Sequence, residues 1–283
     1  MQQATDTFQS LVPPDAQVEQ VATGFQFTEG PAWDGKGALY FSDIPGDTIY
    51  RLGSDGNVSP FLKPSGKSNG LMFDRDGTLL ACRHWTRDVV RIAMDGKLTV
   101  LADSFGGKPL NSPNDLIVAR DGSIYFTDPH YGLEGRPQEQ DCEAVYRLAA
   151  NGTLTRVVND MTRPNGLFIS PDGKTLYVAD SEDRKLRAYT LGPDGSATNG
   201  RDFIDLSADR EGVPDGMALD SRGNLYCTAD GIWVITPEGR PLGKIPVPEV
   251  PANCEFGGPE NRDLYITARH SVYRIRLNAR GLR

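Results

Sequence analysis

Short runs of aromatic and β-branched residues recur along the chain, and most of them end at an acidic or other polar residue. The clearest runs are ALYFSDI (38–44), SIYFTDP (123–129), TLYVADS (175–181), NLYCTAD (224–230) and DLYITAR (263–269). Residues of these types pack well on the pleated surface of a sheet. No segment longer than about ten residues carries a strong 3.6-residue repeat of apolar positions. The pattern therefore predicts an all-β protein.

Turns that contain glycine separate these runs, in two series. The first series is Asp34-Gly35, Asp76-Gly77, Asp121-Gly122, Asp172-Gly173 and Arg222-Gly223. The second series is Asp55-Gly56, Asp95-Gly96, Asn151-Gly152, Asp194-Gly195 and Glu238-Gly239. Asp-Gly and Asn-Gly supply the positive φ that tight hairpins need. The last unit departs from the rule, since Pro259-Glu260-Asn261 takes the place of its first glycine turn.

One short phrase stands before the strand runs and occurs six times. It reads TEGPAW (28–33), SNGLMF (68–73), SPNDLI (112–117), RPNGLF (163–168), VPDGMA (213–218) and ANCEFG (252–257). Aligned, the phrases place one oxygen-bearing side chain at a shared position, and this column consists of Glu29, Asn69, Asn114, Asn165, Asp215 and Asn253. Successive members are 40, 45, 51, 50 and 38 residues apart, which is the spacing of propeller blades. We therefore expect a six-bladed β-propeller with four-stranded antiparallel blades, formed as one domain by residues 1–283.

The two ends of the chain are expected to share a blade, because closing the ring in this way leaves no exposed sheet edge. Residues 16–25 alternate in polarity and are expected to pair beside residues 271–277. Residues 1–14, which contain Pro13-Pro14, are expected to form a loose N-terminal arm.

The shared column would form a ring at one mouth of the central channel, because the innermost strand of each propeller blade lines that channel. Glu29 and Asp215 would bring two negative charges there, and Asn114 and Asn165 would add neutral carbonyl oxygens. These are the hard oxygen donors that calcium prefers. The column contains no histidine or thiolate, which argues against a preference for zinc. A metal site in the central channel is therefore expected.

An alternative exists for each asparagine, since Asn before Gly is often a turn residue bonded to its own backbone. This structural role is preferred for Asn69 and Asn253. It explains Glu29 and Asp215 less well, because two carboxylates in a column of amides repel each other unless a cation offsets their charge.

The phrases resemble those of the senescence marker protein, gluconolactonase and luciferin-regenerating enzyme family, over about residues 18–277. The strongest matches are TEGPAW, LNSPNDL, RPNGLFISPDGKTLYVADS and VPDGMALD. The resemblance implies a six-bladed propeller with one divalent metal in its channel, bound by Glu29, Asn165 and Asp215, with Asn114 beside or upon it. Calcium is expected first, and zinc, magnesium or manganese are alternatives that depend on availability. The runs CRHWTR and FTDPHYGL look most like the gluconolactonase branch, whose members hydrolyse sugar lactones.

The expected reaction is hydrolysis of a cyclic ester by water. Its tetrahedral intermediate carries negative charge on the former carbonyl oxygen, which a divalent cation can stabilise. Asp215 is the candidate base, because a carboxylate at the metal can also reach a water next to the substrate. The chain has no GxSxG nucleophile elbow, so direct attack by water is expected instead of an acyl-enzyme.

Loops next to the ring are expected to hold the hydroxyl groups of the sugar. The candidates follow the second strands of blades two and three and, with Asn114, are Arg83, His84, His130 and Tyr131. The alternative is that these are exposed or packing residues. Residues 133–144 form the largest insertion, either a lid or exposed decoration. For Glu255, a place within a strand is preferred over a role as a pocket carboxylate. Trp33 and Trp85 either line the pocket or pack between blades.

Charge and composition limit the partners. The net charge of −8 and the pI near 5.0 argue against nucleic acid and favour a small-molecule lactone as the partner. No apolar run approaches a transmembrane length, and no signal sequence stands at the start, so we expect no membrane contact and a soluble, cytoplasmic protein. A trimmed signal peptide would make the protein periplasmic. Either a monomer or a small homo-oligomer is compatible with these features.

Cys82, Cys142, Cys227 and Cys254 lack CxxC spacing and are expected to be reduced and mostly buried. Two other functions remain open beside the sugar lactonase. The first is a phosphotriesterase or lipophilic-lactone hydrolase of the same fold, which the polar candidates Arg83, His84, His130 and Tyr131 disfavour. The second is a non-catalytic binding scaffold, which has no need of carboxylates in the ring.

Overall fold

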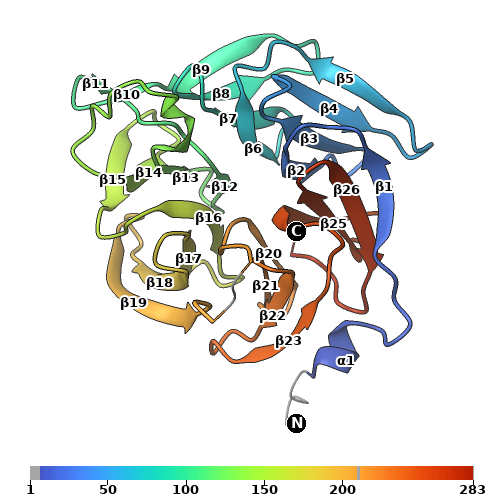
Figure 1. Cartoon of the computed structure of the whole chain (residues 1–283). Helices are drawn as coiled ribbons and strands as arrows, with labels where there is room; N and C mark the ends of the chain where they lie inside the picture. The colour runs from blue at the N-terminus through green and yellow to red at the C-terminus, as the bar shows by residue number, and fades with distance from the viewer. Residues whose placement is uncertain (1–6, 209–210, 283) are drawn as a thin grey trace.

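The computed structural model describes residues 7–208 and 211–282 and shows six antiparallel four-stranded sheets arranged in a ring (Figure 1). The first blade contains β2 (Thr28–Trp33), β3 (Leu39–Asp43), β4 (Thr48–Leu52) and β5 (Val58–Leu62). The second contains β6 (Ser68–Phe73), β7 (Leu79–Arg83), β8 (Asp88–Ile92) and β9 (Leu98–Ala102). The third contains β12 (Leu116–Val118), β13 (Ile124–Asp128), β14 (Ala144–Leu148) and β15 (Leu154–Val158).

The remaining blades follow the same order, from the channel outwards. The fourth contains β16 (Pro164–Ile169), β17 (Thr175–Asp180), β18 (Lys185–Leu191) and β19 (Ala197–Asp205). The fifth contains β20 (Met217–Leu219), β21 (Leu225–Thr228), β22 (Ile232–Ile235) and β23 (Pro241–Ile245). The sixth contains β24 (Pro251–Gly257), β25 (Asp263–Ala268), β26 (Ser271–Arg276) and β1 (Glu19–Thr23). The predicted six-bladed propeller is confirmed.

The ring closes through its last blade, where β1 from the start of the chain pairs antiparallel with β26 from its end (Figure 1). The register places Glu19 opposite Arg274 and Thr23 opposite Ser271. This pairing was predicted for residues 16–25, and it leaves the sixth blade with three strands from one end of the chain and one from the other.

The predicted glycine turns have the expected backbone. All ten glycines of the two series have φ between 70° and 88°. In the last blade, Asn261 takes the left-handed conformation with φ of 56°, and its N–H donates to the carbonyl of Gly258 at 3.0 Å. Asparagine tolerates this conformation better than most residues, which is why the unit keeps its turn without the usual Asp-Gly pair.

Acidic residues at the ends of second strands hold the segments that lead into the channel. In three blades the carboxylate accepts a backbone N–H from the loop that precedes the innermost strand, so each loop is fixed where it reaches the channel mouth. These bonds run from Phe27 to Asp43 (3.0 Å), from Asn111 to Asp128 (2.8 Å) and from Thr162 to Asp180 (2.8 Å).

Hydrophobic packing between neighbouring blades forms the core. The second strands β3, β7, β13 and β25 are buried along their whole length. Tyr226 of the fifth blade meets Phe256 of the sixth edge to face, with ring centroids 5.0 Å apart. Trp33 of the first blade stacks on Tyr265 of the sixth at 5.5 Å, so Trp33 packs between blades and does not line the channel mouth.

Of the expected loose arm, residues 1–6 lie outside the described part of the chain. Residues 7–14 differ from that expectation. They contain the short helix α1 (Phe8–Leu11), and Leu11 and Val12 are buried in the core of the last two blades. The carbonyl of Leu11 also accepts the N–H of Asn278 at 2.9 Å. Burial of these apolar side chains holds the segment in place, which the diproline pattern did not indicate.

Three smaller features complete the fold. A hairpin of β10 (Ser104–Phe105) and β11 (Lys108–Pro109) precedes the third blade, and the 3₁₀ helix η1 (Tyr131–Leu133) follows β13. All four cysteines are free thiols and only Cys142 is not fully buried, as predicted. Within the described residues, no helix has the length and apolar character needed to cross a membrane.

Candidate functional site

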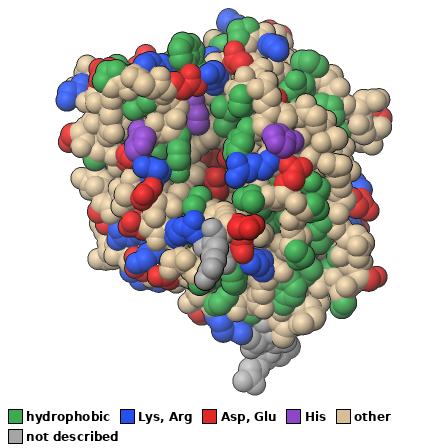
Figure 2. All heavy atoms as spheres, in the orientation of Figure 1, with side chains coloured by type: hydrophobic (Ala, Val, Ile, Leu, Met, Phe, Trp, Pro, Cys, Tyr) green, Lys and Arg blue, Asp and Glu red, His purple; other side chains and the backbone are tan. Residues whose placement is uncertain are grey.

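Five of the six column residues line one cavity at the mouth of the central channel. They are Glu29, Asn69, Asn114, Asn165 and Asp215. The cavity has a volume of about 420 Å³. Figure 2 shows acidic side chains at the floor of a central hollow, with basic side chains beside it. The ring closure therefore brings together residues that lie as much as 186 positions apart in the sequence, from Glu29 to Asp215.

Close approach of neighbouring blades explains why glycine follows most of these residues. The four glycines are Gly30, Gly70, Gly166 and Gly216. A Cβ on Gly30 would lie 2.1 Å from the carbonyl oxygen of Asn69, and one on Gly166 would lie 2.3 Å from that of Asp215. Only Gly30 among the four has a positive φ. Asn69 and Asn165 stand inside β6 and β16, so they are strand residues at a tight contact and not turn residues.

A chain of hydrogen bonds orients the amides of the ring. The side-chain N–H₂ of Asn69 donates to the Oδ1 of Asn114, and that of Asn114 donates to the Oδ1 of Asn165 at 2.8 Å. Asn165 in turn donates to the Oγ of Ser181 at 3.0 Å, and Ser181 donates to the carbonyl of Pro214 at 2.7 Å. Each amide carbonyl retains a free lone pair for a further partner in the cavity. Asn69, for which a structural role was preferred, positions Asn114 and also lines the cavity.

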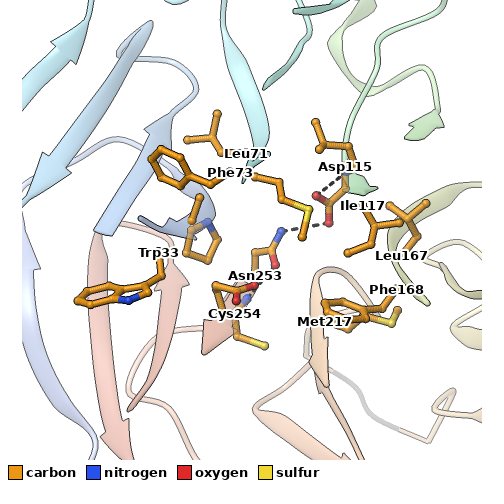
Figure 3. Close-up of a pocket in the computed structure, with 15 residues that line it drawn as sticks. Trp33, Leu71, Phe73, Asp115, Ile117, Leu167, Phe168, Met217, Asn253 and Cys254 are labelled. Atoms are coloured by element: carbon orange, nitrogen blue, oxygen red, sulfur yellow. Dashed lines mark hydrogen bonds between the residues drawn. The ribbon is translucent and has the colours of Figure 1, made fainter. Parts of the chain in front are cut away.

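Asn253, the sixth column residue, does not line the mouth cavity, although its side chain also hydrogen-bonds Glu29. Its Nδ2 donates to the Oδ2 of Asp115 at 3.3 Å, and its Oδ1 accepts the N–H of Cys254 at 2.8 Å. Figure 3 shows this pair in a smaller cavity of about 90 Å³, which Glu255 also lines. Glu255 thus lies in strand β24, as expected, and faces a cavity as well.

Asp115 is a channel carboxylate that sequence reasoning missed. It stands at the position that glycine occupies in four of the six repeats, so the phrase SPND differs there from RPNG and VPDG. That break in the repeat was the available signal. Its carboxylate lies in the channel beside Gly70, where an added Cβ would come within 2.5 Å of the Asp115 Oδ1.

The channel concentrates buried carboxylates. Burial raises the pKa of Glu29 to about 8, that of Asp115 to about 6 and that of Glu255 to about 8. The pKa of Asp215 is raised well above its usual range, first by burial and then by the Glu29 and Asp115 carboxylates, while Arg269 opposes this shift. A cation near Glu29 and Asp215 would relieve both the desolvation and the repulsion.

The donor set at the mouth fits a hard divalent cation. It combines the carboxylates of Glu29 and Asp215 with amide oxygens of Asn114 and Asn165 around one cavity. Among the residues that the structure describes, no three His, Cys, Asp or Glu side chains gather as a metal site. A cation would therefore depend on the amides, which is the oxygen-only chemistry that calcium accepts.

Two of the four loop residues predicted to hold substrate line the mouth cavity, namely His84 and Tyr131. The Nε2 of His84 lies 3.3 Å from the Nδ2 of Asn69. Burial lowers the pKa of His84 to about 4, so the imidazole is neutral at pH 7. Tyr131 stands at the start of η1 and stays partly exposed.

The other two, Arg83 and His130, do not line the cavity. Arg83 is buried and makes two hydrogen bonds to Asp88, at 2.8 Å and 2.6 Å, because the two residues are directly opposite in the β7–β8 ladder. The Nδ1 of His130 lies 2.5 Å from a carboxylate oxygen of Glu143. Each side chain is engaged with an acidic partner outside this cavity, so contact of Arg83 and His130 with substrate stays a prediction.

Two arginines at the cavity were not anticipated. Arg184 and Arg269 both line it, and both come from turns after the second strand of their blade. These turns are equivalent to the loops that carry His84 and Tyr131. The signal was the loop position itself, because the predicted substrate contacts came only from the second and third blades.

The insertion after the third blade's second strand is anchored to the second blade. The guanidinium of Arg136 donates to the carbonyls of Trp85 (2.6 Å) and His84 (3.2 Å) and lies over the Trp85 ring at 4.5 Å. Lys67 and Glu134 add an ion pair at 2.5 Å. Trp85 is half exposed and packs against the insertion without lining the cavity. Residues 133–144 therefore brace the loop that carries His84.

Replacing Glu255 by glutamine is expected to flatten the pH dependence of stability. The folded-state pKa of about 8 exceeds the ordinary value of 4.5. The contribution of Glu255 to the free energy of unfolding is therefore full below about pH 4.5 and is lost as the pH rises through 8. The free energy of unfolding, measured by urea at constant calcium from about pH 5 to about pH 9, should fall less in Glu255→Gln than in the wild type. Glu238→Gln, at an exposed turn, is the control, and equal slopes in all three proteins would contradict the prediction.

The fold and the site define a class: a six-bladed β-propeller whose inner strands bring carboxylates and amides to one channel mouth. A family model described as the SMP-30/Gluconolactonase/LRE-like region matches residues 27–270, and the chain belongs to this family. The resemblance seen in the repeated phrases is thus confirmed.

Individual relatives agree with this assignment. A gluconolactonase from Zymomonas mobilis is 36% identical over 293 residues, which cover 93% of this chain and 82% of that protein. A solved gluconolactonase from Xanthomonas campestris is 34% identical, with a TM-score of 0.89 over 95% of this chain and 91% of that one. Regucalcin from Agrobacterium tumefaciens, a calcium-binding protein, has a TM-score of 0.79 over 94% of this chain and 96% of its own. At 22% identity it shows a common fold.

Proposed function

We propose that this protein is a divalent-metal-dependent lactonase that hydrolyses sugar lactones, with a specificity like that of gluconolactonases. The observation that carries the proposal is the cavity at the channel mouth, where Glu29 and Asp215 stand among oriented amides. Relatives named gluconolactonase, similar over most of both chains, support the same reaction.

Glu29, Asn165 and Asp215 would hold the cation, with Asn114 as a fourth oxygen donor or a contact to the substrate. Calcium suits this set of hard oxygens best, and magnesium, manganese or zinc are the alternatives. When bound, the cation would supply polarisation of the lactone carbonyl and stabilise the negative charge that develops on its oxygen.

Asp215 would act as the proton acceptor. Its carboxylate takes a proton from the attacking water as the new C–O bond forms, and returns it to the ring oxygen when the ester bond breaks. The products are one hydroxyl and one carboxyl group on a single opened chain. Arg269 favours the ionised form of Asp215, which the base needs at neutral pH.

His84 and Tyr131 would orient the substrate from the loops. A neutral imidazole both donates and accepts, and a phenol does the same, so the two groups suit the hydroxyls of a sugar ring. His84 is held by Asn69 on one side and by the Arg136 contact to its carbonyl on the other. The polar lining favours a sugar lactone over a lipophilic one.

The proposal is tested by proton release from D-glucono-1,5-lactone, corrected for spontaneous hydrolysis, with each of the four metals. A long-chain γ-lactone and a phosphotriester serve as comparison substrates. We expect the sugar lactone to be hydrolysed with calcium at a kcat/KM of at least about 10⁴ M⁻¹s⁻¹, and the others far more slowly. Absence of hydrolysis with every metal would exclude the sugar lactonase, and preference for the phosphotriester would change the substrate class.

A further inference from the structure

Positive charge stands at the rim of the mouth cavity, on Arg184 and Arg269, and the steps of lactone hydrolysis do not require both groups. The described residues that line the cavity include two carboxylates, on Glu29 and Asp215, and these two guanidinium groups. A divalent cation held by the two carboxylates would balance their charge and leave Arg269 available to a further anionic group.

Arg269 is placed to meet a ligand. Its side chain is exposed, and its guanidinium lies 5.7 Å from the centroid of the Phe27 ring, which also lines the cavity. Among the described residues Arg269 makes no ion pair, whereas Arg83 pairs with Asp88 and Arg163 with Glu182. A planar guanidinium that stacks on one face keeps its N–H donors available at the edge.

The two arginines share a backbone conformation. Arg184 has φ of 55° and Arg269 has φ of 46°, a left-handed conformation that is uncommon outside glycine. Both residues stand in turns on the same face of the ring as the column residues, because they line the same cavity. Val250, Pro251 and Ala252, which lie beside Arg269 in the same blade, also line the cavity and carry no charge.

We propose that the substrate is a sugar lactone that carries an anionic substituent away from the reacting carbonyl, and that Arg269 binds this substituent with Arg184 as the second rim cation. A carboxylate, phosphate or sulfonate group would each satisfy the guanidinium. The inference rests on the proposed lactonase function and adds the charge of the substrate. The net charge of −8 on the whole chain makes local attraction necessary for such a ligand.

The test uses two lactones that differ at one carbon. D-Glucono-1,4-lactone and D-glucaro-1,4-lactone share the ring, and at C6 the first has a hydroxymethyl group where the second has a carboxylate. We expect the wild type to prefer the glucarolactone in kcat/KM. Arg269→Gln should lower this preference, measured as the ratio of the two kcat/KM values, roughly tenfold to hundredfold, which is the range of a charge-assisted hydrogen bond. Arg269→Lys should restore part of the preference.

Arg201→Gln is the matched control, since Arg201 is exposed and lies over Phe203 at 5.5 Å on the outer strand β19, away from the mouth. It should leave the preference unchanged. Equal losses on both lactones in Arg269→Gln would overturn the inference, because they would indicate a general effect on Asp215 or on the product carboxylate. A wild type that prefers the neutral lactone would overturn it as well.

Binding of the opened acids separates this inference from the proposed function. Calorimetric titration with D-glucarate and D-gluconate, which differ at the same carbon, needs no catalysis. Tighter binding of glucarate that disappears in Arg269→Gln would uphold the anionic specificity even if neither lactone were hydrolysed. Equal binding of the two acids by the wild type would overturn it, even if both lactones were hydrolysed.

Discussion

Replacing Asp215 by asparagine is expected to lower kcat for sugar-lactone hydrolysis by about a thousandfold. Asparagine keeps the shape of the side chain and can still contact the ring of amides, but it cannot accept a proton from water. It also removes one of the two negative charges that would hold the cation. The measurement is proton release from D-glucono-1,5-lactone at saturating calcium. Asp183→Asn, an exposed residue in the turn before Arg184, should keep wild-type activity.

Loss of activity in Asp215→Asn must be separated from loss of the fold. Removal of a buried carboxylate whose pKa is raised by burial and by its acidic neighbours should not lower the melting temperature of the metal-free protein. A variant that is stable and inactive supports the role of Asp215 as base. Full activity in Asp215→Asn would show that another group accepts the proton, without any consequence for the propeller.

Removal of the divalent cation is expected to abolish hydrolysis and to lower the melting temperature by about 5 °C relative to calcium-saturated protein. The physical reason is the repulsion between Glu29 and Asp215, which a bound cation replaces with attraction. The measurement combines thermal unfolding with elemental analysis, after chelation and after addition of calcium, magnesium, manganese or zinc.

Two glutamates of the channel provide a matched comparison for the metal. Glu29→Gln should reduce the melting response to calcium strongly, because Glu29 faces the mouth cavity. Glu255→Gln should retain the response, because Glu255 lines the smaller cavity beyond the ring. No thermal response of the wild type to any of the four ions would contradict the metal site and leave the fold assignment intact.

The blade count and the turns were accessible from the sequence because they depend on local chemistry. Asp-Gly and Asn-Gly pairs set the backbone of a hairpin within a few residues, and Gly77 and Gly122 have the left-handed φ that this requires. The repeat of about 40 to 50 residues then predicts six copies of this unit. The N-terminal arm was not accessible in this way, since Leu11 and Val12 are held by core residues of the last two blades, more than 200 positions away.

The candidate site was accessible only in part. Equivalent positions in a closed ring converge, so Glu29, Asn165 and Asp215 could be grouped from their alignment alone. The direction of Asn253 could not, because it depends on the partner Asp115 in another blade. The position of Arg83 could not be predicted for a similar reason, since it depends on the cross-strand partner Asp88.

By itself, the sequence determined the kind of chain segment at each place: where strands begin, where turns reverse them, and which side chains carry oxygen donors. These depend on neighbours along the chain. Only the tertiary structure decided which donors face the mouth cavity, that Asn253 and Asp115 pair beyond it, and that Arg184 and Arg269 stand at its rim. Those outcomes depend on how closely adjacent blades approach, as at Gly30 and Gly166, where a single added carbon would meet the next blade's backbone.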